Sequence, residues 1–291
     1  MRDLMLRYLS KRQIRIISSL KKSVFLYISI ALSKIIKLLF NYRIVIYLQN
    51  NLQVLRKLKY QKRDVYINLN SEYEYGMRLH SKDREPDTVK WIEENIKNGD
   101  IFYDIGANVG TYSLIAALSR DKNIKVYSFE PSFTNFYQLV RNISANKCEE
   151  CMFPFNIAIS DKSKVDYFNY SSLETGTAVH AFGEAVDPSG NKFTPVMRQL
   201  LFSFTIDELV YKYNLPVPNH LKIDVDGIEE KILLGAEEVL SSKYLKTVLI
   251  EVNESDNEKT IVDLIESKGL KYISRQAVDN SHAGNYIFIR Q

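Results

Sequence analysis

The sequence has little cysteine and histidine, and neither residue type is arranged for a disulfide framework or a metal site. The 291 residues include two cysteines and four histidines. Cys148 and Cys151 have the spacing of half a zinc site or a redox pair, but no second such pair and no histidine cluster completes a tetrahedral ligand set. We therefore predict no metal, a reducing compartment, and a loop ahead of a strand for the two cysteines.

The sequence also lacks an apolar run long enough to cross a bilayer. The most apolar segment, residues 23–33, is interrupted afterwards by Lys34 and Lys37, whereas a spanning helix needs about twenty apolar residues. The run begins late, more basic sequence follows it, and no small-residue cleavage site is present, so a secretory signal is not expected. We predict a cytoplasmic protein.

Acidic residues are nearly absent from the first 63 residues, which hold fifteen Lys and Arg against the single acid Asp3. The rest of the chain is acidic, which disfavours nucleic acid as its partner. Apolar residues recur at helical spacing over residues 1–60, a pattern typical of an amphipathic helix. Such a helix is expected to lie on the inner face of the membrane without crossing it. The alternative is that these helices pack on the catalytic domain or on a partner subunit.

The sequence predicts two parts, a basic helical extension over residues 1–63 and an α/β domain over residues 64–291. In the second part, apolar runs alternate with helical patterns, which indicates a largely parallel sheet. About seven strands are expected, at residues 101–105, 126–129, 153–159, 221–225, 247–252, 271–273 and 285–289. Residues 169–202 interrupt this alternation with several Gly and Pro, and we expect an irregular insertion that contributes to specificity.

Polar residues close the first two strands, and ligands bind at the carboxyl ends of parallel strands. The first strand ends in a loop in which Gly106 and Gly110 allow a tight turn and a close backbone approach. The loop opens with Asp104, where a dinucleotide-binding fingerprint has glycine, and an acid there repels phosphate. Glu130 closes the next strand and is placed to accept hydrogen bonds from ribose hydroxyls. An adenosine cofactor with positive charge fits both acids, and S-adenosyl-L-methionine (SAM) carries a sulfonium and an ammonium group.

Two later strands also close with polar residues. Asp224 and Asp226 follow one of them, and either is a candidate for the base or the group that orients an acceptor hydroxyl. His180, in the insertion, ranks lower as a base; it is considered because histidine titrates near neutrality. A magnesium-assisted variant, with Asn253 as a further oxygen ligand, is the less favoured alternative.

The ordered motifs of this sequence resemble those of the FkbM-type methyltransferases. The resemblance covers about residues 85–252 and includes FYDIGANVGTYSL at 102–114, FEPS at 129–132, NIAISD at 156–161, TIDEL at 205–209, LKIDVDG at 221–227 and IEV at 250–252. One position differs, since the family commonly has Glu where Asp226 stands, and the shorter side chain withdraws the carboxylate by roughly 1.5 Å.

The resemblance implies a Rossmann-like seven-stranded class I methyltransferase sheet whose last hairpin is antiparallel, with SAM as the methyl donor. It further implies O-methylation of a saccharide or other small-molecule hydroxyl, in surface-polysaccharide or natural-product biosynthesis. Two alternatives from other classes are an RNA methyltransferase that holds phosphates with its basic arm, and a non-catalytic membrane-associated interaction protein that retains the cofactor fold. The predicted cofactor-binding residues are Asp104, Gly106, Asn108, Gly110, Glu130, Pro131, Ser132, Ala158 and Asp224, and the catalytic candidates are Asp224, Asp226 and His180.

Overall fold

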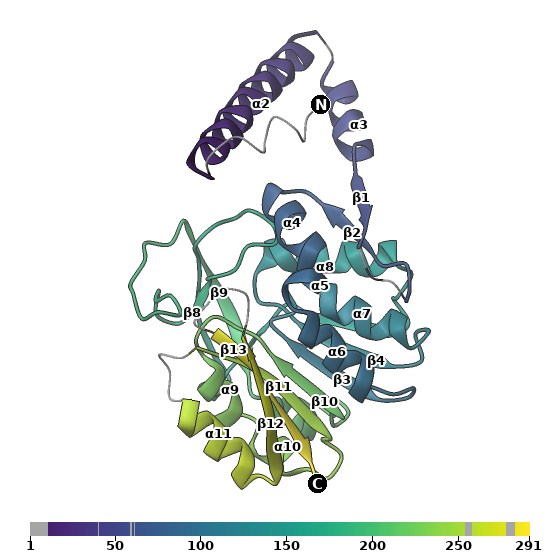
Figure 1. Ribbon diagram of the computed structural model, residues 1–291, viewed down its shortest axis with the longest axis vertical. Helices are drawn as coiled ribbons and strands as arrows, with labels where there is room; N and C mark the ends of the chain where they lie inside the picture. The colour runs from purple at the N-terminus through teal and green to yellow at the C-terminus, as the bar shows by residue number, and fades with distance from the viewer. Residues whose placement is uncertain (1–10, 40, 59, 61, 254–257, 278–282) are drawn as a thin grey trace. The chain divides into compact units, whose positions relative to one another are not determined.

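The chain divides into two compact units, Met1–Gln53 and Val54–Gln291. A computed structural model describes residues 11–39, 41–58, 60, 62–253, 258–277 and 283–291 (Figure 1). The division falls earlier than the boundary predicted after residue 63. The physical reason is that strand β1 (Val54–Lys57) pairs antiparallel with strand β2 (Tyr66–Leu69), which ties residues 54–57 to the second unit.

Within its described residues, the first unit contains two helices, α2 (Lys11–Leu39) and α3 (Tyr42–Asn51). Asn41 caps the second helix by accepting a hydrogen bond from the backbone N–H of Arg43 at 3.0 Å. Helix α2 carries a run of exposed apolar side chains, namely Val24, Phe25, Leu26, Tyr27, Ile28, Ile30, Leu32, Ile35, Leu38 and Leu39. Among the described residues, no helix is both long enough and apolar enough to cross a membrane. The predicted helical pattern also covered residues 1–10, which lie outside the described residues.

A seven-stranded sheet forms the centre of the second unit. Its strands are β3 (Ile101–Ile105), β4 (Lys125–Phe129), β5 (Met152–Phe155), β10 (His220–Ile223), β11 (Thr247–Asn253), β12 (Leu270–Ala277) and β13 (Ala283–Arg290). They are ordered β12-β13-β11-β10-β3-β4-β5. Strand β13 is antiparallel to both of its neighbours, whereas the pairs from β11 to β5 are parallel. The predicted Rossmann-like class I sheet with its antiparallel last hairpin is therefore confirmed.

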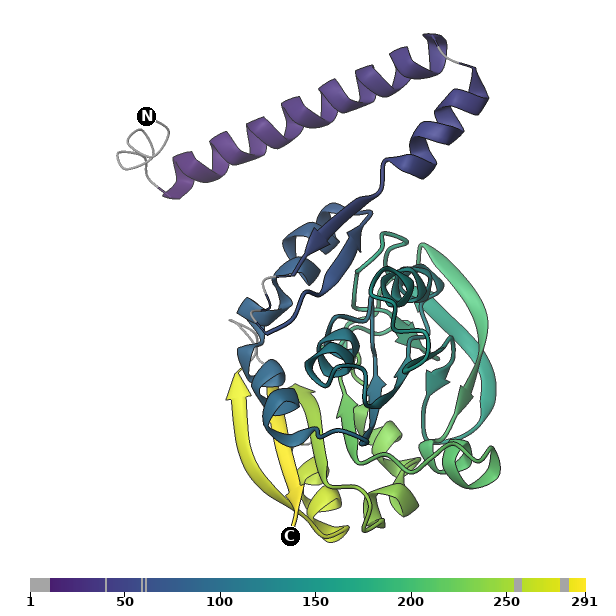
Figure 2. The same cartoon turned by 90° about the vertical axis from the view of Figure 1, so that its right-hand side faces the viewer.

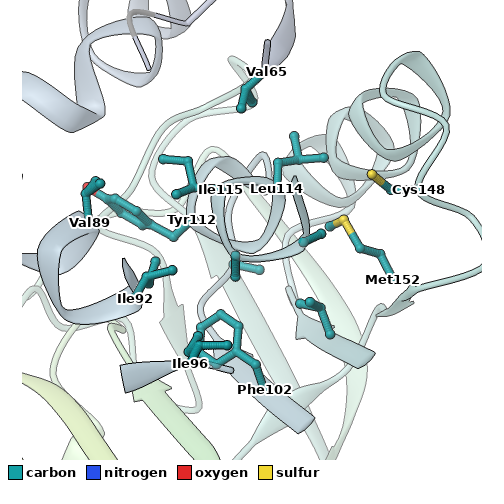
Figure 3. Packing of buried hydrophobic residues seen from close by; sticks show 14 of the residues in the cluster. Val65, Val89, Ile92, Ile96, Phe102, Tyr112, Leu114, Ile115, Cys148 and Met152 are labelled. Carbon is teal, nitrogen blue, oxygen red and sulfur yellow. The ribbon is translucent and has the colours of Figure 1, made fainter. Parts of the chain in front are cut away.

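Helices cover both faces of this sheet, as Figures 1 and 2 show. One layer consists of α6 (Pro86–Asn95), α7 (Thr111–Ser119) and α8 (Phe133–Ala145), and the other of α9 (Glu229–Leu234), α10 (Glu237–Ser241) and α11 (Glu258–Ser267). Each layer has its own buried apolar cluster. Figure 3 shows the first cluster, in which Ile92 of α6, Ile96 directly after that helix and Ile115 of α7 pack with Phe102 of β3. These packed layers hold the strand ends in fixed positions.

A smaller four-stranded sheet corrects two of the sequence predictions. It contains β6 (Ala158–Ile159), β7 (Lys164–Tyr170), β8 (Ala181–Phe182) and β9 (Met197–Phe204), in the order β6-β9-β7-β8. The single strand predicted over residues 153–159 is two strands, β5 and β6, which belong to different sheets. The insertion over residues 169–202 is not irregular throughout, because β7 and β9 pair antiparallel across it.

A segment ahead of the sheet lies beside the strand ends. After β2 it forms α4 (Glu72–Gly76), the 3-10 turn η1 (Arg78–His80) and α5 (Ser81–Arg84); a π-helical turn, η2 (Glu208–Lys212), follows β9. Ser71 begins α4 with a capping box, since its hydroxyl accepts a hydrogen bond from the N–H of Glu74 at 2.9 Å. Strand β2 is tied to α8 because the N–H of Asn68 donates to Asn142 at 2.8 Å. These contacts fix the α4–α5 segment in place.

Candidate functional site

A cavity of about 310 Å³ lies at the carboxyl ends of β3, β4, β10 and β11. The α4–α5 segment and the insertion complete its wall. The parallel register brings residues together that are far apart in the sequence, because Asp104 is the partner of both Ser128 and Lys222 on the two adjacent strands. This is the edge at which open parallel sheets bind their ligands.

The loop after β3 is built on glycines that no other residue replaces without strain. Gly106 has a φ of +78°, and a Cβ atom on it would lie 1.9 Å from the carbonyl oxygen of Asp224. Gly110 has a φ of +85°, and its Cβ would lie 2.4 Å from a methyl carbon of Leu139. Only glycine adopts this conformation without a Cβ penalty. The loop therefore passes in direct contact with the end of β10.

Glu130 closes β4 and holds the same loop. One carboxylate oxygen accepts a hydrogen bond from the N–H of Asn108 at 2.7 Å and the other from the N–H of Ser132 at 2.9 Å. Burial raises the pKa of Glu130 to about 7, although these two N–H donors lower it. A carboxylate oxygen accepts more than one hydrogen bond. Glu130, which lines the cavity, therefore keeps acceptor capacity for hydroxyl groups of a ligand.

Asp104 lies behind the cavity wall rather than in it. It is fully buried, and one oxygen accepts a hydrogen bond from the hydroxyl of Ser113 at 2.6 Å. Its other oxygen, Oδ1, lies 3.5 Å from the Nζ of Lys222 and has no hydrogen-bond partner among the described residues. Asp104 therefore does not contact the cavity directly, and its negative charge acts on the buried Lys222, which lies between Asp104 and the cavity residue Asp224.

Lys222 is 1% exposed and connects Asp104 with Asp224. Its Nζ donates to Asp224 at 2.7 Å and lies 5.2 Å from the ring centroid of Tyr112, in cation–π contact. Burial lowers the pKa of Lys222, but the carboxylates of Asp224, Asp104 and Glu85 outweigh this and hold the pKa above its ordinary value. The lysine is therefore a permanent cation that fixes the position of Asp224.

Two glutamates that were not among the predicted site residues line the same cavity, Glu85 and Glu251. The last paired residues of β10 and β11 are Ile223 and Ile250, so the residues that follow them, Asp224 and Glu251, are neighbours. Burial, reinforced by Asp224 and then Glu85, raises the pKa of Glu251 to about 9. Burial and the charge of Asp224 also raise the pKa of Glu85. Glu251 is therefore protonated at neutral pH.

The carboxylate of Asp226 is hydrogen-bonded to the backbone of the insertion. Its Oδ2 accepts hydrogen bonds from the N–H of Val179 at 2.6 Å and of His180 at 3.2 Å. Val179 has a φ of +64°, which is strained for a β-branched residue. Burial and the charge of Asp224 raise the pKa of Asp226 to about 6, and the two N–H donors lower it. Asp226 therefore holds a strained turn of the insertion against the cavity.

His180 is 7% exposed, and both ring nitrogens are engaged within the insertion. Its Nδ1 accepts a hydrogen bond from the N–H of Ser171 at 3.3 Å, and its Nε2 lies 3.4 Å from the hydroxyl of Thr177. Burial lowers the pKa of His180 to about 4, and the charge of Arg78 lowers it further. The histidine is therefore neutral at neutral pH, with neither nitrogen open to a ligand proton.

The insertion is also tied to the glycine loop and to the α4–α5 segment. The carbonyl of Thr177 accepts hydrogen bonds from the side-chain amides of Asn108 and Asn135, each at 3.0 Å. The carbonyl of Gly176 accepts one from the Nε of Arg78 at 2.8 Å. Backbone carbonyls of the insertion thus form part of the wall that faces the glycine loop.

The structure brings most of the predicted site residues to one cavity. Those that line it are Gly106, Asn108, Glu130, Pro131, Ala158, His180, Asp224 and Asp226. The remaining three, Asp104, Gly110 and Ser132, support the wall from behind, Ser132 as the cap of α8. The side chain of Asn253 lies outside the described residues, and within the described part of the chain no group of three His, Cys, Asp or Glu side chains is placed to hold a metal ion.

Several residues of this site were not among the predicted site residues, including Arg78, Glu85, Tyr112, Lys222 and Glu251. Two of them carried a signal, since Lys222 alternates with Asp224 along one face of a strand and Glu251 ends an apolar run. Arg78 and Glu85 reach the cavity only through the packing of the α4–α5 segment. No spacing rule along the chain predicts that contact.

Comparison with known proteins places these features in a family. The model of the methyltransferase FkbM domain matches residues 104–272. The hexuronic acid methyltransferase AglP of Haloferax volcanii is 23% identical over 193 residues, which are 66% of this chain and 72% of that protein. The 31-O-demethyl-FK506 methyltransferase FkbM of Streptomyces tacrolimicus is 23% identical over 206 residues, which are 62% of this chain and 76% of that protein.

Among solved structures, methyltransferase FkbM from Methylobacillus flagellatus KT is similar, with a TM-score of 0.48 and 13% identity. The match covers 67% of this chain but only 44% of that one. Family membership rests on the domain match, which includes the glycine loop, Glu130 and the residues that close β10.

SAM fits the residues that are present. A buried acid, Glu130, faces the cavity beside a glycine loop that approaches it closely, and five carboxylates against two arginines line the wall, which favours a ligand with positive charge. SAM is the methyl donor, as the resemblance implied. The chain belongs to the FkbM family of methyltransferases.

Proposed function

We propose that this protein is an O-methyltransferase that transfers the methyl group of SAM to a hydroxyl of a saccharide or other small molecule. The observation that carries the proposal is the position of Asp224. Its backbone contacts the glycine loop at Gly106, and its carboxylate lines the cavity and is held by Lys222. A carboxylate beside the donor loop is suited to take the proton that an acceptor hydroxyl loses.

Roles for the surrounding residues follow from this geometry. Glu130 would accept hydrogen bonds from the ribose hydroxyls, and Gly106, Asn108, Pro131 and Ala158 would contact the rest of the donor. SAM supplies an activated methyl group when bound. The remaining task of the protein is to hold the acceptor oxygen in line with that group and to exclude water. Asp226 is a positioning residue for the insertion in this scheme, and His180 ranks below Asp224 as a base.

The relatives support a hydroxylated acceptor. The two named above are a hexuronic acid methyltransferase and a 31-O-demethyl-FK506 methyltransferase, and the second name specifies methylation at an oxygen. Surface-polysaccharide or natural-product biosynthesis is the corresponding setting for this chain.

We also propose that the first unit binds the membrane peripherally, at its cytoplasmic face. Two observations support this proposal: apolar side chains on α2, such as Phe25 and Ile28, are exposed, and basic residues greatly outnumber acidic ones in the first 63 residues. Apolar contact and attraction to anionic lipids act together in such segments.

Methyl transfer is tested with purified protein, SAM and a panel of saccharides, by measuring release of S-adenosylhomocysteine. Asp224→Asn is expected to lower turnover while SAM affinity changes little, and Asp263→Asn, an exposed acid on α11, serves as the matched control. A variant Asp224→Asn with turnover close to that of the intact enzyme would remove the basis of the proposal.

A further inference from the structure

One end of the cavity lies between β10, β11 and the starts of α6 and α7. Three acids meet there: Asp224 after β10, Glu251 in β11, and Glu85 directly before α6. All three line the cavity, and Lys222 donates to Asp224 at 2.7 Å. The charge of Asp224 raises the pKa of both glutamates, and the charge of Lys222 lowers it. Glu85 is held from behind, because Thr88 donates to its carboxylate at 3.3 Å and Asn285 donates to Thr88 at 3.2 Å.

A second observation at this cavity points to a ligand. Thr111, at the start of α7, lines the cavity and is 4% exposed. Its hydroxyl has no hydrogen-bond partner among the described residues. A buried hydroxyl without a partner costs free energy, and a ligand that enters the cavity would supply the missing partner. The adjacent residue, Tyr112, forms the cation–π contact with Lys222.

We propose that Glu85 and Glu251, together with Asp224, form the acceptor subsite, and that this subsite takes an uncharged polyhydroxy compound rather than an acidic one. The inference rests on the proposed function and deepens it by naming the charge class of the acceptor. It concerns the part of the acceptor that is methylated.

Charge argues against an acidic acceptor. At this end of the cavity, burial and the charge of Asp224 disfavour ionisation even of the wall residues Glu251 and Glu85. Lys222 is not available to an acceptor carboxylate, because Asp104 and Asp224 already pair with it. A carboxylate on the acceptor would meet the same burial and the same negative charge.

The acids have different tasks. The raised pKa of Glu251 makes this side chain a neutral hydrogen-bond donor at neutral pH, which can orient ring oxygens or hydroxyls of a sugar. Burial also raises the pKa of Glu85, which lines the same end of the cavity. In the transfer itself, the acceptor oxygen forms a bond to the methyl carbon as the carbon–sulfur bond breaks, and the hydroxyl proton passes to the carboxylate of Asp224.

Sugar binding is measured by saturation-transfer NMR in the presence of S-adenosylhomocysteine, with methyl α-glucopyranoside and glucuronate as probes. The intact protein is expected to bind the uncharged sugar and not glucuronate. Glu251→Leu should weaken that binding at least tenfold, and Glu251→Gln should retain it, because an amide is also neutral and donates hydrogen bonds. Glu238→Leu, at an exposed position of α10, is the matched control.

Infrared spectroscopy tests the same acid without any acceptor. The intact protein should show the carbonyl band of protonated carboxylic acids at neutral pH, and both Glu251 variants should lose part of its intensity while Glu238→Leu keeps it in full. Preference for glucuronate, absence of binding of the uncharged sugar, loss of sugar binding in Glu251→Gln, or a band of undiminished intensity in the Glu251 variants would overturn the inference. If Glu251→Leu does not fold, Glu251→Gln carries the test. Calorimetry with SAM tests the proposed function separately, because a protein that is not a SAM-dependent methyltransferase would show no SAM binding.

Discussion

Replacing Gly106 by alanine separates two effects that glycine has in the donor loop, and Gly99 offers a matched control. Both glycines have left-handed backbone torsions, with φ of +78° and +83°. An L-residue in that conformation costs about 1–2 kcal/mol. The two positions differ in space, because nothing lies within 4 Å of a Cβ at Gly99, whereas a Cβ at Gly106 would lie 1.9 Å from the carbonyl oxygen of Asp224.

The expected magnitudes follow from this difference. Gly99→Ala carries only the torsional cost, and a loss of 1 kcal/mol lowers Tm by about 2–4 °C in a domain of this size. In Gly106→Ala the backbone of Asp224 must move by more than an ångström, since Cβ contacts under 3.0 Å do not occur. Overpacking of that kind costs roughly a further 1–3 kcal/mol. It also displaces the residue to which we assign the proton transfer.

Thermal melts and SAM calorimetry on both variants test the reasoning. Gly106→Ala should melt well below Gly99→Ala and should bind SAM at least tenfold more weakly, while Gly99→Ala binds SAM normally. Equal melting temperatures for the two variants, together with equal SAM affinities, would refute the close approach of the donor loop to β10.

Four further predictions concern catalysis, pH, metal and membrane. Asp224→Asn should lower turnover by about a hundred- to ten-thousand-fold, as loss of a general base does, with SAM affinity unchanged by calorimetry and Asp263→Asn unaffected. The pKa of Asp226 is about 6 in the folded protein, above its ordinary value of 3.8, so the folded state binds more protons than the unfolded state between these pH values. The free energy of unfolding, measured by urea titration, should therefore fall as pH rises from about 4 to 6. The variant Asp226→Asn should show a smaller dependence on pH over that range. EDTA should leave turnover unchanged, and a loss that magnesium restores would indicate a metal-assisted mechanism instead. Full-length protein should co-sediment with anionic vesicles at low salt, and high salt or the pair Lys34→Glu and Lys37→Glu should reduce binding; equal binding to neutral vesicles would contradict the electrostatic part.

The strands and their polar ends were predictable because they depend on local pattern. The apolar runs that end at or just before Asp104, Glu130 and Asp224 each predict a buried strand, and the structure has a strand at each of them. The direction in which a side chain points depends on contacts with residues that are distant in the sequence. Asp104 follows the same rule as Glu130, yet Ser113 and Lys222 bind it on the far side of the wall.

Long-range packing explains what the sequence did not predict. Arg78 and Glu85 precede the repeating part of the domain, and only the docking of α4–α5 beside the strand ends brings them to the cavity. The insertion reads as irregular because its glycines and prolines mark turns, whereas the pairing of β7 with β9 spans about thirty residues and leaves no periodic signal. His180 was a reasonable base from its chemistry, and only the contacts with Ser171 and Thr177 show that its nitrogens are engaged.

Calorimetric titration with SAM, of intact protein and of Glu130→Ala, tests the central claim most directly. The intact protein should bind one SAM per chain. The variant should bind about ten- to a hundred-fold more weakly, because charge-assisted hydrogen bonds are worth roughly 1.5–3 kcal/mol, and a cooperative melt should show that the variant still folds. No heat of SAM binding to the intact protein, or an unchanged affinity in a folded Glu130→Ala, would contradict the assignment of this cavity as the donor site.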